Sequence, residues 1–79
     1  MNILYSKQAV KSINRMDKPT KQRVKQGIEK IPSGDIKPLQ GATGVFRLRI
    51  GDWRILFFYE NNNIIINKIA PRGEIYKGV

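Results

Sequence analysis

The feature that most constrains the fold is a change in the spacing of apolar residues near Val45. Before this point, apolar residues recur at every third or fourth position, which is typical of helices. After it, they alternate with polar residues, which is typical of strands. The sequence therefore predicts helices followed by antiparallel hairpins. Because 79 residues suffice for one modest core, we expect residues 1–79 to form a single domain.

Two helices are predicted after a short apolar strand, "NILY", at residues 2–5. Ser6 is the expected N-cap of the first helix, and Asp17 and Pro19 are expected to begin the second. Gly27 within the second helix indicates close packing, because glycine weakens a helix. The apolar positions of the first helix are Ala9, Val10, Ile13 and Met16, and those of the second are Val24, Ile28 and Ile31. The segment "IPSGD" is expected to end the second helix.

Three strands are predicted in the C-terminal half, at residues 45–50, 53–59 and 64–70, after a loop formed by "IKPLQGATG". Gly51 and Asp52 form a two-residue hairpin turn, and "ENNN" forms a second turn. The last strand is almost wholly apolar, which favours a central position with the first strand as its other neighbour. We therefore expect a two-layer α+β fold, β-α-α-β-β-β, with a helical hairpin packed on one face of a mainly antiparallel four-stranded sheet.

The charge balance favours a polyanionic partner. Fifteen basic and six acidic residues give a net charge of +9, which attracts nucleic acid, an acidic protein or a membrane surface. A basic surface that serves only solubility is the alternative. The chain has no His and no Cys, so the commonest general base and the commonest transition-metal ligands are missing. We expect no metal and no small-molecule cofactor, and chemistry confined to Arg, Lys, Tyr, Asp and Glu.

The sequence also predicts where the protein works. No apolar run approaches the roughly 20 residues of a membrane span, and the segment "MNILYSKQAV" does not resemble a secretion signal. The lack of cysteine is consistent with a reducing compartment. We therefore expect a cytoplasmic protein without a membrane partner.

Three arginines are predicted to share one face of the first hairpin. With Gly51 and Asp52 in the turn, Arg49 lies opposite Arg54, and pleat parity puts Arg47 on the same face. Directly opposed like charges destabilise a sheet, so this arrangement is a candidate for binding an anion. Guanidinium groups match phosphate oxygens in a bidentate geometry. Alternatively, the arginine stems merely cover apolar neighbours.

Two further residues are candidates for the same face. Arg72 and Tyr76 lie in "APRGEIYKG", which follows the last strand and is able to fold back over the sheet. The alternatives are a loop charge for Arg72 and an amphipathic anchor for Tyr76. Trp53 is assigned to the core face or its rim. Lys68 is left unplaced, because a one-residue shift of register across "ENNN" would reverse its face.

The segment "KPLQGATGVFRLRIGDWRILFFYENNNIIINKIAPRGEIYK" resembles the RelE/ParE superfamily of bacterial type II toxins. Shared features are a Leu-x-Gly loop, an "R-x-R" strand, a Gly-Asp-aromatic-Arg turn, an aromatic-rich strand, and an Arg before a Glu-x-Tyr tail. The resemblance runs over nearly the whole chain. It implies either a RelE-type endoribonuclease, which cuts mRNA in the ribosomal decoding site, or a ParE-type inhibitor of DNA gyrase.

The resemblance also implies a set of site residues. Arg47 and Arg49 match the basic pair on the second family strand, Arg54 the third-strand Arg, Arg72 the later Arg, and Tyr76 the C-terminal Tyr. All five positions are filled, which favours the RelE branch. Some RelE proteins have Lys at the first two positions.

The general base is left open by this pattern. Arginine does not readily lose a proton. Some relatives use a Glu and a His, and this chain has no His. Tyr76 is a candidate for orienting the hydroxyl or for acid–base work, and Glu60 and Glu74 are unsupported candidates for the base.

The expected function is that of the toxin of a type II toxin–antitoxin system. We expect a metal-independent endoribonuclease in which the RNA 2′-hydroxyl attacks the adjacent phosphate of translated mRNA. The expected partners are a cognate antitoxin protein and mRNA on the ribosome. The alternatives are a ParE-like gyrase inhibitor that acts by binding, and a non-catalytic basic RNA-binding module.

Overall fold

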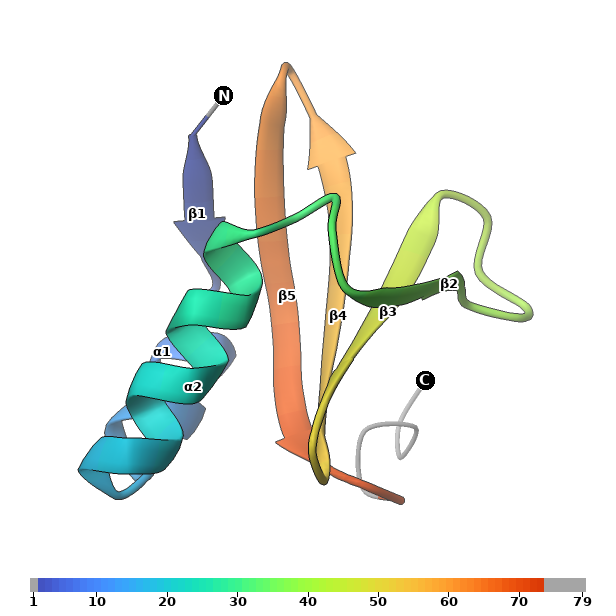
Figure 1. Ribbon diagram of the computed structural model, residues 1–79. Helices are drawn as coiled ribbons and strands as arrows, with labels where there is room; N and C mark the ends of the chain where they lie inside the picture. The colour runs from blue at the N-terminus through green and yellow to red at the C-terminus, as the bar shows by residue number, and fades with distance from the viewer. Residues whose placement is uncertain (1, 74–79) are drawn as a thin grey trace.

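The computed structural model describes residues 2–73, which form a five-stranded sheet with two helices on one face (Figure 1). The strand order is β1-β5-β4-β3-β2. From β2 to β5, each strand pairs antiparallel with the next strand along the chain, and β1 pairs parallel with β5. The elements are β1 Ile3–Tyr5, α1 Lys7–Asn14, α2 Lys18–Glu29, β2 Asp35–Pro38, β3 Val45–Ile50, β4 Trp53–Glu60 and β5 Asn63–Pro71.

The predicted two-layer α+β fold is confirmed, but the sheet has five strands rather than the four expected from the sequence. The additional strand is β2, which occupies the start of the predicted loop and pairs antiparallel with β3. Ile36 of β2 lies opposite Leu48 and packs against the main core. Because β2 is an edge strand, Pro38 at its end is tolerated without disrupting a central ladder.

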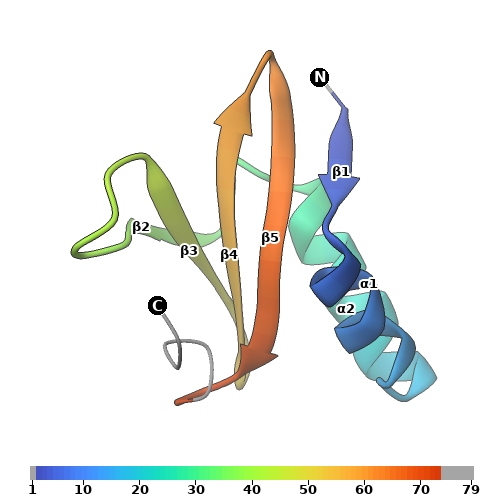
Figure 2. The ribbon, with the colours of Figure 1, turned by 180° about the vertical axis from the view of Figure 1, so that it is seen from behind.

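The predicted central position of the last strand is also confirmed. β5 lies between β4 and β1, with Ile3 opposite Ile64 and Tyr5 opposite Ile66. Figure 2 shows this order from behind the view of Figure 1. A strand with neighbours on both sides and apolar contacts along its length suits the sequence "IIINKIA".

The start of α1 follows the predicted capping chemistry. Ser6 is the N-cap, and its Oγ accepts a hydrogen bond from the backbone N–H of Ala9 at 3.1 Å. Ala9 and Ile13 are buried, as their helical spacing predicts. Val10, which was assigned to the same face, is 43% exposed. Val10 is only one position from Ala9, and thus about 100° away around the helix, so it lies beside the buried stripe rather than within it.

The second helix begins at the predicted cap and packs closely on the sheet. Asp17 is the N-cap by backbone conformation, although its side chain makes no capping hydrogen bond, and Pro19 lies in the first turn. Gly27 faces β3, where a Cβ atom at this position would overlap the side chain of Ile50. The glycine therefore permits the close approach of helix and sheet that the sequence indicated.

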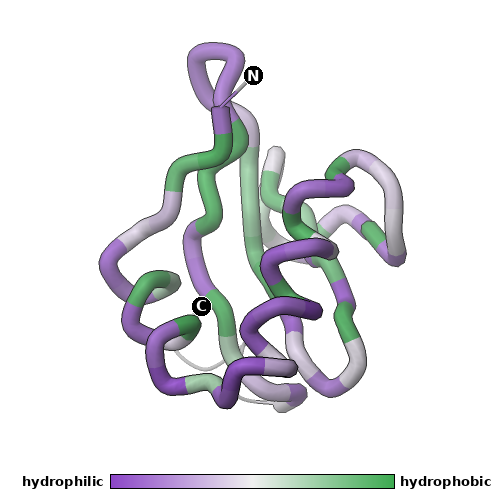
Figure 3. The backbone as a smooth tube through the Cα atoms, turned by 60° about the vertical axis from the view of Figure 1, so that its left-hand side comes forward, coloured by the Kyte–Doolittle hydropathy of each residue, from purple (hydrophilic) through white to green (hydrophobic). Residues whose placement is uncertain are grey.

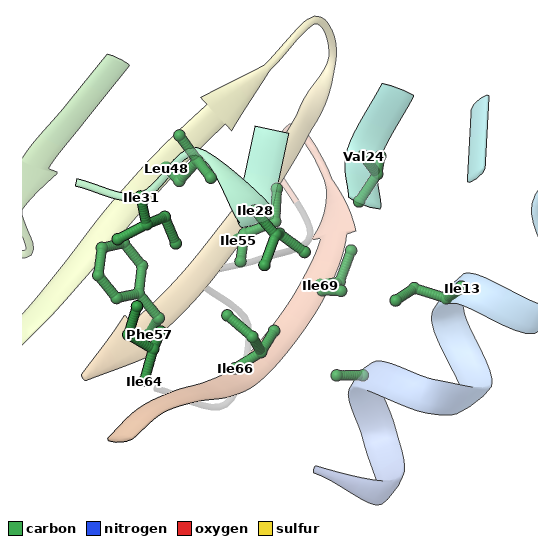
Figure 4. Close-up of a cluster of buried hydrophobic side chains, with 11 residues drawn as sticks. Ile13, Val24, Ile28, Ile31, Leu48, Ile55, Phe57, Ile64, Ile66 and Ile69 are labelled. Carbon is green, nitrogen blue, oxygen red and sulfur yellow. The ribbon is translucent and has the colours of Figure 1, made fainter. Parts of the chain in front are cut away.

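The main core lies between the helical hairpin and the sheet (Figure 4). Full burial of each large aliphatic or aromatic side chain contributes about 1.5–3 kcal/mol. In Figure 3 hydrophilic residues predominate along the two helices, and most basic residues of the hairpin are exposed. The buried cluster comprises Ala9, Ile13, Val24, Ile28, Ile31, Leu48, Ile55, Phe57, Ile64, Ile66 and Ile69.

Candidate functional site

The structure brings three of the five predicted site residues onto one face of the sheet. Arg49 lies directly opposite Arg54, and Arg47 lies opposite Leu56, as hairpin counting predicts. The neighbouring positions Leu48 and Ile55 point into the main core beneath the helices. Arg47, Arg49 and Arg54 therefore occupy the face away from the helices, which we call the arginine face.

The three arginines differ in their exposure to solvent. Arg49 is exposed, Arg47 is partly buried, and only 7% of Arg54 is exposed. The guanidinium of Arg54 donates from Nη1 to the backbone oxygen of Gly51 at 3.0 Å and to that of Trp53 at 3.3 Å. Among the described residues, no carboxylate forms an ion pair with Arg54. Arg54 thus braces the hairpin turn while keeping its positive charge within the arginine face.

Arg47 is held by an acidic residue of the neighbouring edge strand. Its Nη2 atom lies 3.3 Å from Oδ1 of Asp35, and the two side chains are 17% and 47% exposed. The Nε atom of Arg47 is buried and has no hydrogen-bond partner. Sequence analysis missed Asp35 because it placed this residue in the segment that ends α2. In the structure, Asp35 begins β2 and lies opposite Arg49.

Two lysines extend the positive charge of this face. Lys37 lies opposite Arg47, and both line a surface pocket of about 440 Å³ together with Pro38, Leu39 and Gln40. Lys68 lies opposite Leu56, which settles the face that the sequence left open. The pairing of β4 with β5 shifts register between Leu56 and Phe57, where β5 has one extra residue. The alternation of β5 side chains between the two faces is therefore reversed beyond this point.

The arginine face is not open throughout. Leu56 and Ala70 are 3% and 7% exposed and form a second small apolar cluster, against which Leu39 and Val45 pack. Trp53 is partly buried against the main core on the opposite face, as predicted. The positive charges therefore lie beside a small apolar cluster on this face.

Arg72 lies at the end of β5, next to the hairpin turn. Its backbone N–H donates to the backbone oxygen of Asp52 at 2.7 Å, and the neighbouring Pro71 pairs with Trp53. The turn of residues 51–52 is therefore contacted by the Arg54 side chain and by the Arg72 backbone. Arg72 is exposed. Tyr76, the fifth predicted site residue, lies outside the described residues.

Two further properties concern residues 2–73 as a whole. Within that range, no three acidic, histidine or cysteine side chains gather in an arrangement suited to a metal ion. Neither of the two helices in this range has the length and apolar character needed to cross a membrane.

Comparison with known proteins identifies the family to which this small basic protein belongs. The family model described as the ParE toxin of type II toxin–antitoxin systems matches residues 3–76. The chain therefore belongs to the RelE/ParE superfamily of type II toxins, as its sequence motifs indicated.

Two curated relatives come from Methanocaldococcus jannaschii. Toxin RelE3 is 27% identical over 84 residues, with 96% of each chain covered. Putative toxin RelE1 is 29% identical over 85 residues, with 96% of this chain and 94% of the relative covered. Both matches extend over almost the whole length of the two proteins.

Solved structures support the same fold. A chain of the RelB–RelE antitoxin–toxin complex from Methanococcus jannaschii matches with a TM-score of 0.76 and 26% identity, covering 92% of this chain and 94% of that one. The RelE–RelB complex from Pyrococcus horikoshii gives a TM-score of 0.70 at 26% identity, covering 91% and 94%. The RelBE2 complex from Mycobacterium tuberculosis, at 18% identity and a TM-score of 0.75 with 90% of each chain covered, shows likeness of fold alone.

Proposed function

We propose that this toxin is a ribosome-dependent endoribonuclease that cleaves translated mRNA without a metal ion. The observation that carries the proposal is the hairpin register that gathers Arg47, Arg49 and Arg54 on one face, beside the end of β5 where Arg72 lies. Guanidinium groups remain charged at all physiological pH values and bind phosphate oxygens through paired donors. The lack of His and Cys throughout the chain leaves the arginines as the main chemical resource.

In the proposed reaction, the 2′-hydroxyl of the RNA attacks the adjacent phosphorus atom. The bond from phosphorus to the 5′-oxygen of the next nucleotide breaks, which leaves a 2′,3′-cyclic phosphate and a free 5′-hydroxyl. Arg47, Arg49 and Arg72 bind the phosphate oxygens, and Arg54 adds positive charge from beneath them. Fixed positive charge around the developing phosphorane lowers the barrier by several kcal/mol, on the order of 3–4 for each well-placed donor. Tyr76 is proposed to orient the hydroxyl or to protonate the leaving oxygen.

The ribosome is proposed to supply what the small domain lacks. An arginine cluster on a sheet binds phosphates without choosing one linkage among many, because phosphate contacts carry no sequence information. The decoding site presents mRNA in a fixed conformation, and such alignment removes much of the entropic barrier. Cleavage is therefore expected to require translation.

A cognate antitoxin is the proposed protein partner. The solved relatives from Methanococcus jannaschii and Pyrococcus horikoshii are described as complexes of RelE with RelB. A net charge of +9 favours an acidic or amphipathic segment, and the helices and the sheet edge are the surfaces on which we expect it to bind.

A ParE-like gyrase inhibitor that acts by binding is the second candidate. The observation in its favour is that the matching family model is the one described for ParE toxins. The curated relatives named RelE and the complete set of arginines favour the nuclease.

The deciding experiment is inducible expression of the toxin with mapping of mRNA 5′ ends, in the presence and absence of translation. We expect new 5′ ends within translated codons only, and their loss in Arg47→Ala, Arg72→Ala and Tyr76→Ala. Arg15→Ala, an exposed charge at the end of α1, is the matched control and should cleave normally. Intact mRNA together with a DNA-damage response would instead establish the gyrase reading.

A further inference from the structure

The geometry points to Asp35 as the general base that takes the proton from the attacking 2′-hydroxyl. This inference rests on the proposed RNA cleavage and adds to it a residue that neither the sequence motifs nor the family resemblance assigns. The reaction needs a base, and the permanently charged arginines are unable to serve as one.

Asp35 is the carboxylate that the sheet places among the arginines. It lies opposite Arg49, and its Oδ1 is 3.3 Å from Nη2 of Arg47. A phosphate bound by these two guanidinium groups would lie beside this carboxylate. Because the 2′-oxygen and the 3′ ester oxygen are carried by adjacent ribose carbons, the 2′-hydroxyl would then be within reach. The Asp35 side chain is 47% exposed, so RNA has access to it.

The other described acidic residues lie elsewhere. Glu60 shares the face by parity but is four positions along β4 from Leu56, which faces Arg47, a distance of about 13 Å. Asp52 lines a groove on the helix side, with Arg23 of α2. Asp17 and Glu29 belong to α2 and its N-cap. Within residues 2–73, Asp35 is therefore the acidic side chain suited to this step.

The step balances without a further reactant. The 2′-hydroxyl proton passes to a carboxylate oxygen of Asp35 as the 2′-oxygen bonds to phosphorus. The 5′-oxygen leaves and takes a proton from water, and the resulting hydroxide recovers the proton from Asp35. Arg47 has two tasks in this scheme, since it holds the phosphate and orients the carboxylate. The charged groups facing Asp35 are Arg47 and Arg49 from β3 and Lys37 from its own strand.

The test compares single-turnover cleavage by full-length variants on ribosomes programmed with a defined mRNA. Asp35→Asn is expected to cleave about 10²–10⁴-fold more slowly, which is the usual contribution of a general base. This variant should also bind ribosomes whose mRNA carries a 2′-deoxy nucleotide at the cleavage point. Its affinity should at least equal that of the native protein, because a negative charge near the phosphate is lost. Asp35→Glu should retain measurable cleavage, and Glu60→Gln, the matched control, should cleave at the normal rate.

A double-mutant cycle separates a base from a residue that only positions Arg47. In the Arg47→Lys background, which keeps a positive charge at this position and is expected to retain slow cleavage, a base predicts that Asp35→Asn causes a further large loss of rate. No further loss in that background would overturn the inference, as would normal cleavage by Asp35→Asn in the otherwise native protein. Both results leave the nuclease function standing. If the native protein leaves mRNA intact, the proposed function itself fails, and the role of Asp35 fails with it.

Discussion

Arg49 and Arg54 lie directly opposite each other on β3 and β4, yet Arg49 is exposed and Arg54 is buried. The two residues therefore play different structural parts on the same face. Arg54 donates to the backbone oxygen of Gly51, so the folded state depends on it. Arg49 has no such bond among the contacts of residues 2–73, and its cross-strand neighbours are Arg54 and Asp35, so the folded state depends on it much less.

The first prediction is that alanine at these two positions affects stability to very different extents. Arg49→Ala should change the free energy of unfolding by less than about 0.5 kcal/mol, because it removes both a repulsive cross-strand pair with Arg54 and an attractive one with Asp35. Arg54→Ala should lower that free energy by about 1–3 kcal/mol, because the part-buried backbone oxygens of Gly51 and Trp53 lose their donor. Urea unfolding measures both values. Equal destabilisation by the two substitutions would contradict the division of roles, and activity lost in Arg54→Ala should be interpreted only alongside its stability.

The second prediction concerns the contact between Gly27 of α2 and Ile50 of β3. Gly27→Ala alone should lower thermal stability, since the new Cβ overlaps Cδ1 of Ile50. Ile50→Ala removes that Cδ1 atom and also Cγ1, which would lie 3.0 Å from the new Cβ. In the Ile50→Ala background, Gly27→Ala should therefore stabilise the protein by up to about 1 kcal/mol, the intrinsic helix preference of Ala over Gly.

The quantity to measure is the effect of Gly27→Ala on the free energy of unfolding, which should change sign between the two backgrounds. A coupling energy of at least about 0.5 kcal/mol is expected for residues in direct contact. Additive effects of the two substitutions would show that helix and sheet approach each other less closely than the structure indicates.

Pleat parity explains why much of the candidate site was predictable from the sequence. The Gly51–Asp52 turn fixes the register of β3 and β4, and the register alone assigns Arg47, Arg49 and Arg54 to one face. These inferences need only local geometry, so tertiary context did not alter them. The catalytic roles of these residues, and of Arg72 and Tyr76, stay predictions.

The features that were missed depend on non-local structure. β2 has one apolar residue facing the core, Ile36, and ends in a proline, so neither alternation nor composition marked it as a strand. Because β2 was not predicted, the position of Asp35 beside Arg47 could not be inferred from the sequence. Lys68 could not be assigned to a face because the register shift between Leu56 and Phe57 is a property of the pairing between β4 and β5.

The third prediction concerns the side chain of Gln8, which occupies the edge of β5 beyond the end of β1. Its Oε1 accepts from the backbone N–H of Ile69 at 3.1 Å, and its Nε2 donates to the backbone oxygen of Ile69 at 3.3 Å. Ser12 Oγ donates to the same oxygen at 2.8 Å. The amide of Gln8 thus makes the two bonds that a neighbouring strand would make.

Gln8→Ala should lower the free energy of unfolding by about 1–3 kcal/mol, because the part-buried Ile69 amide loses its acceptor. Hydrogen exchange of the Ile69 amide should accelerate, which thermal unfolding alone would not reveal. Gln22→Ala, at an exposed position of α2, is the matched control and should leave both quantities almost unchanged. Unchanged exchange at Ile69 in Gln8→Ala would mean that the clamp does not persist in solution.

The last prediction is that stability declines at alkaline pH partly through Tyr5. Burial of the phenol, and secondarily the negative charge of Glu29, raise the pKa of Tyr5 above its ordinary value of 10.0. An acid with a higher pKa in the folded state binds more protons there than in the unfolded chain, so its stabilising contribution is complete below pH 10 and is lost as pH rises through the folded-state pKa.

Tyr5→Phe should remove this part of the decline in the free energy of unfolding, measured by urea titration from pH 8 to above pH 10. Tyr59→Phe, at a 45% exposed site, should leave the native slope in place. Parallel slopes for the native protein and Tyr5→Phe would show that the Tyr5 phenol is hydrated in solution, and that the end of β1 packs more loosely on α2 than the burial of this residue implies.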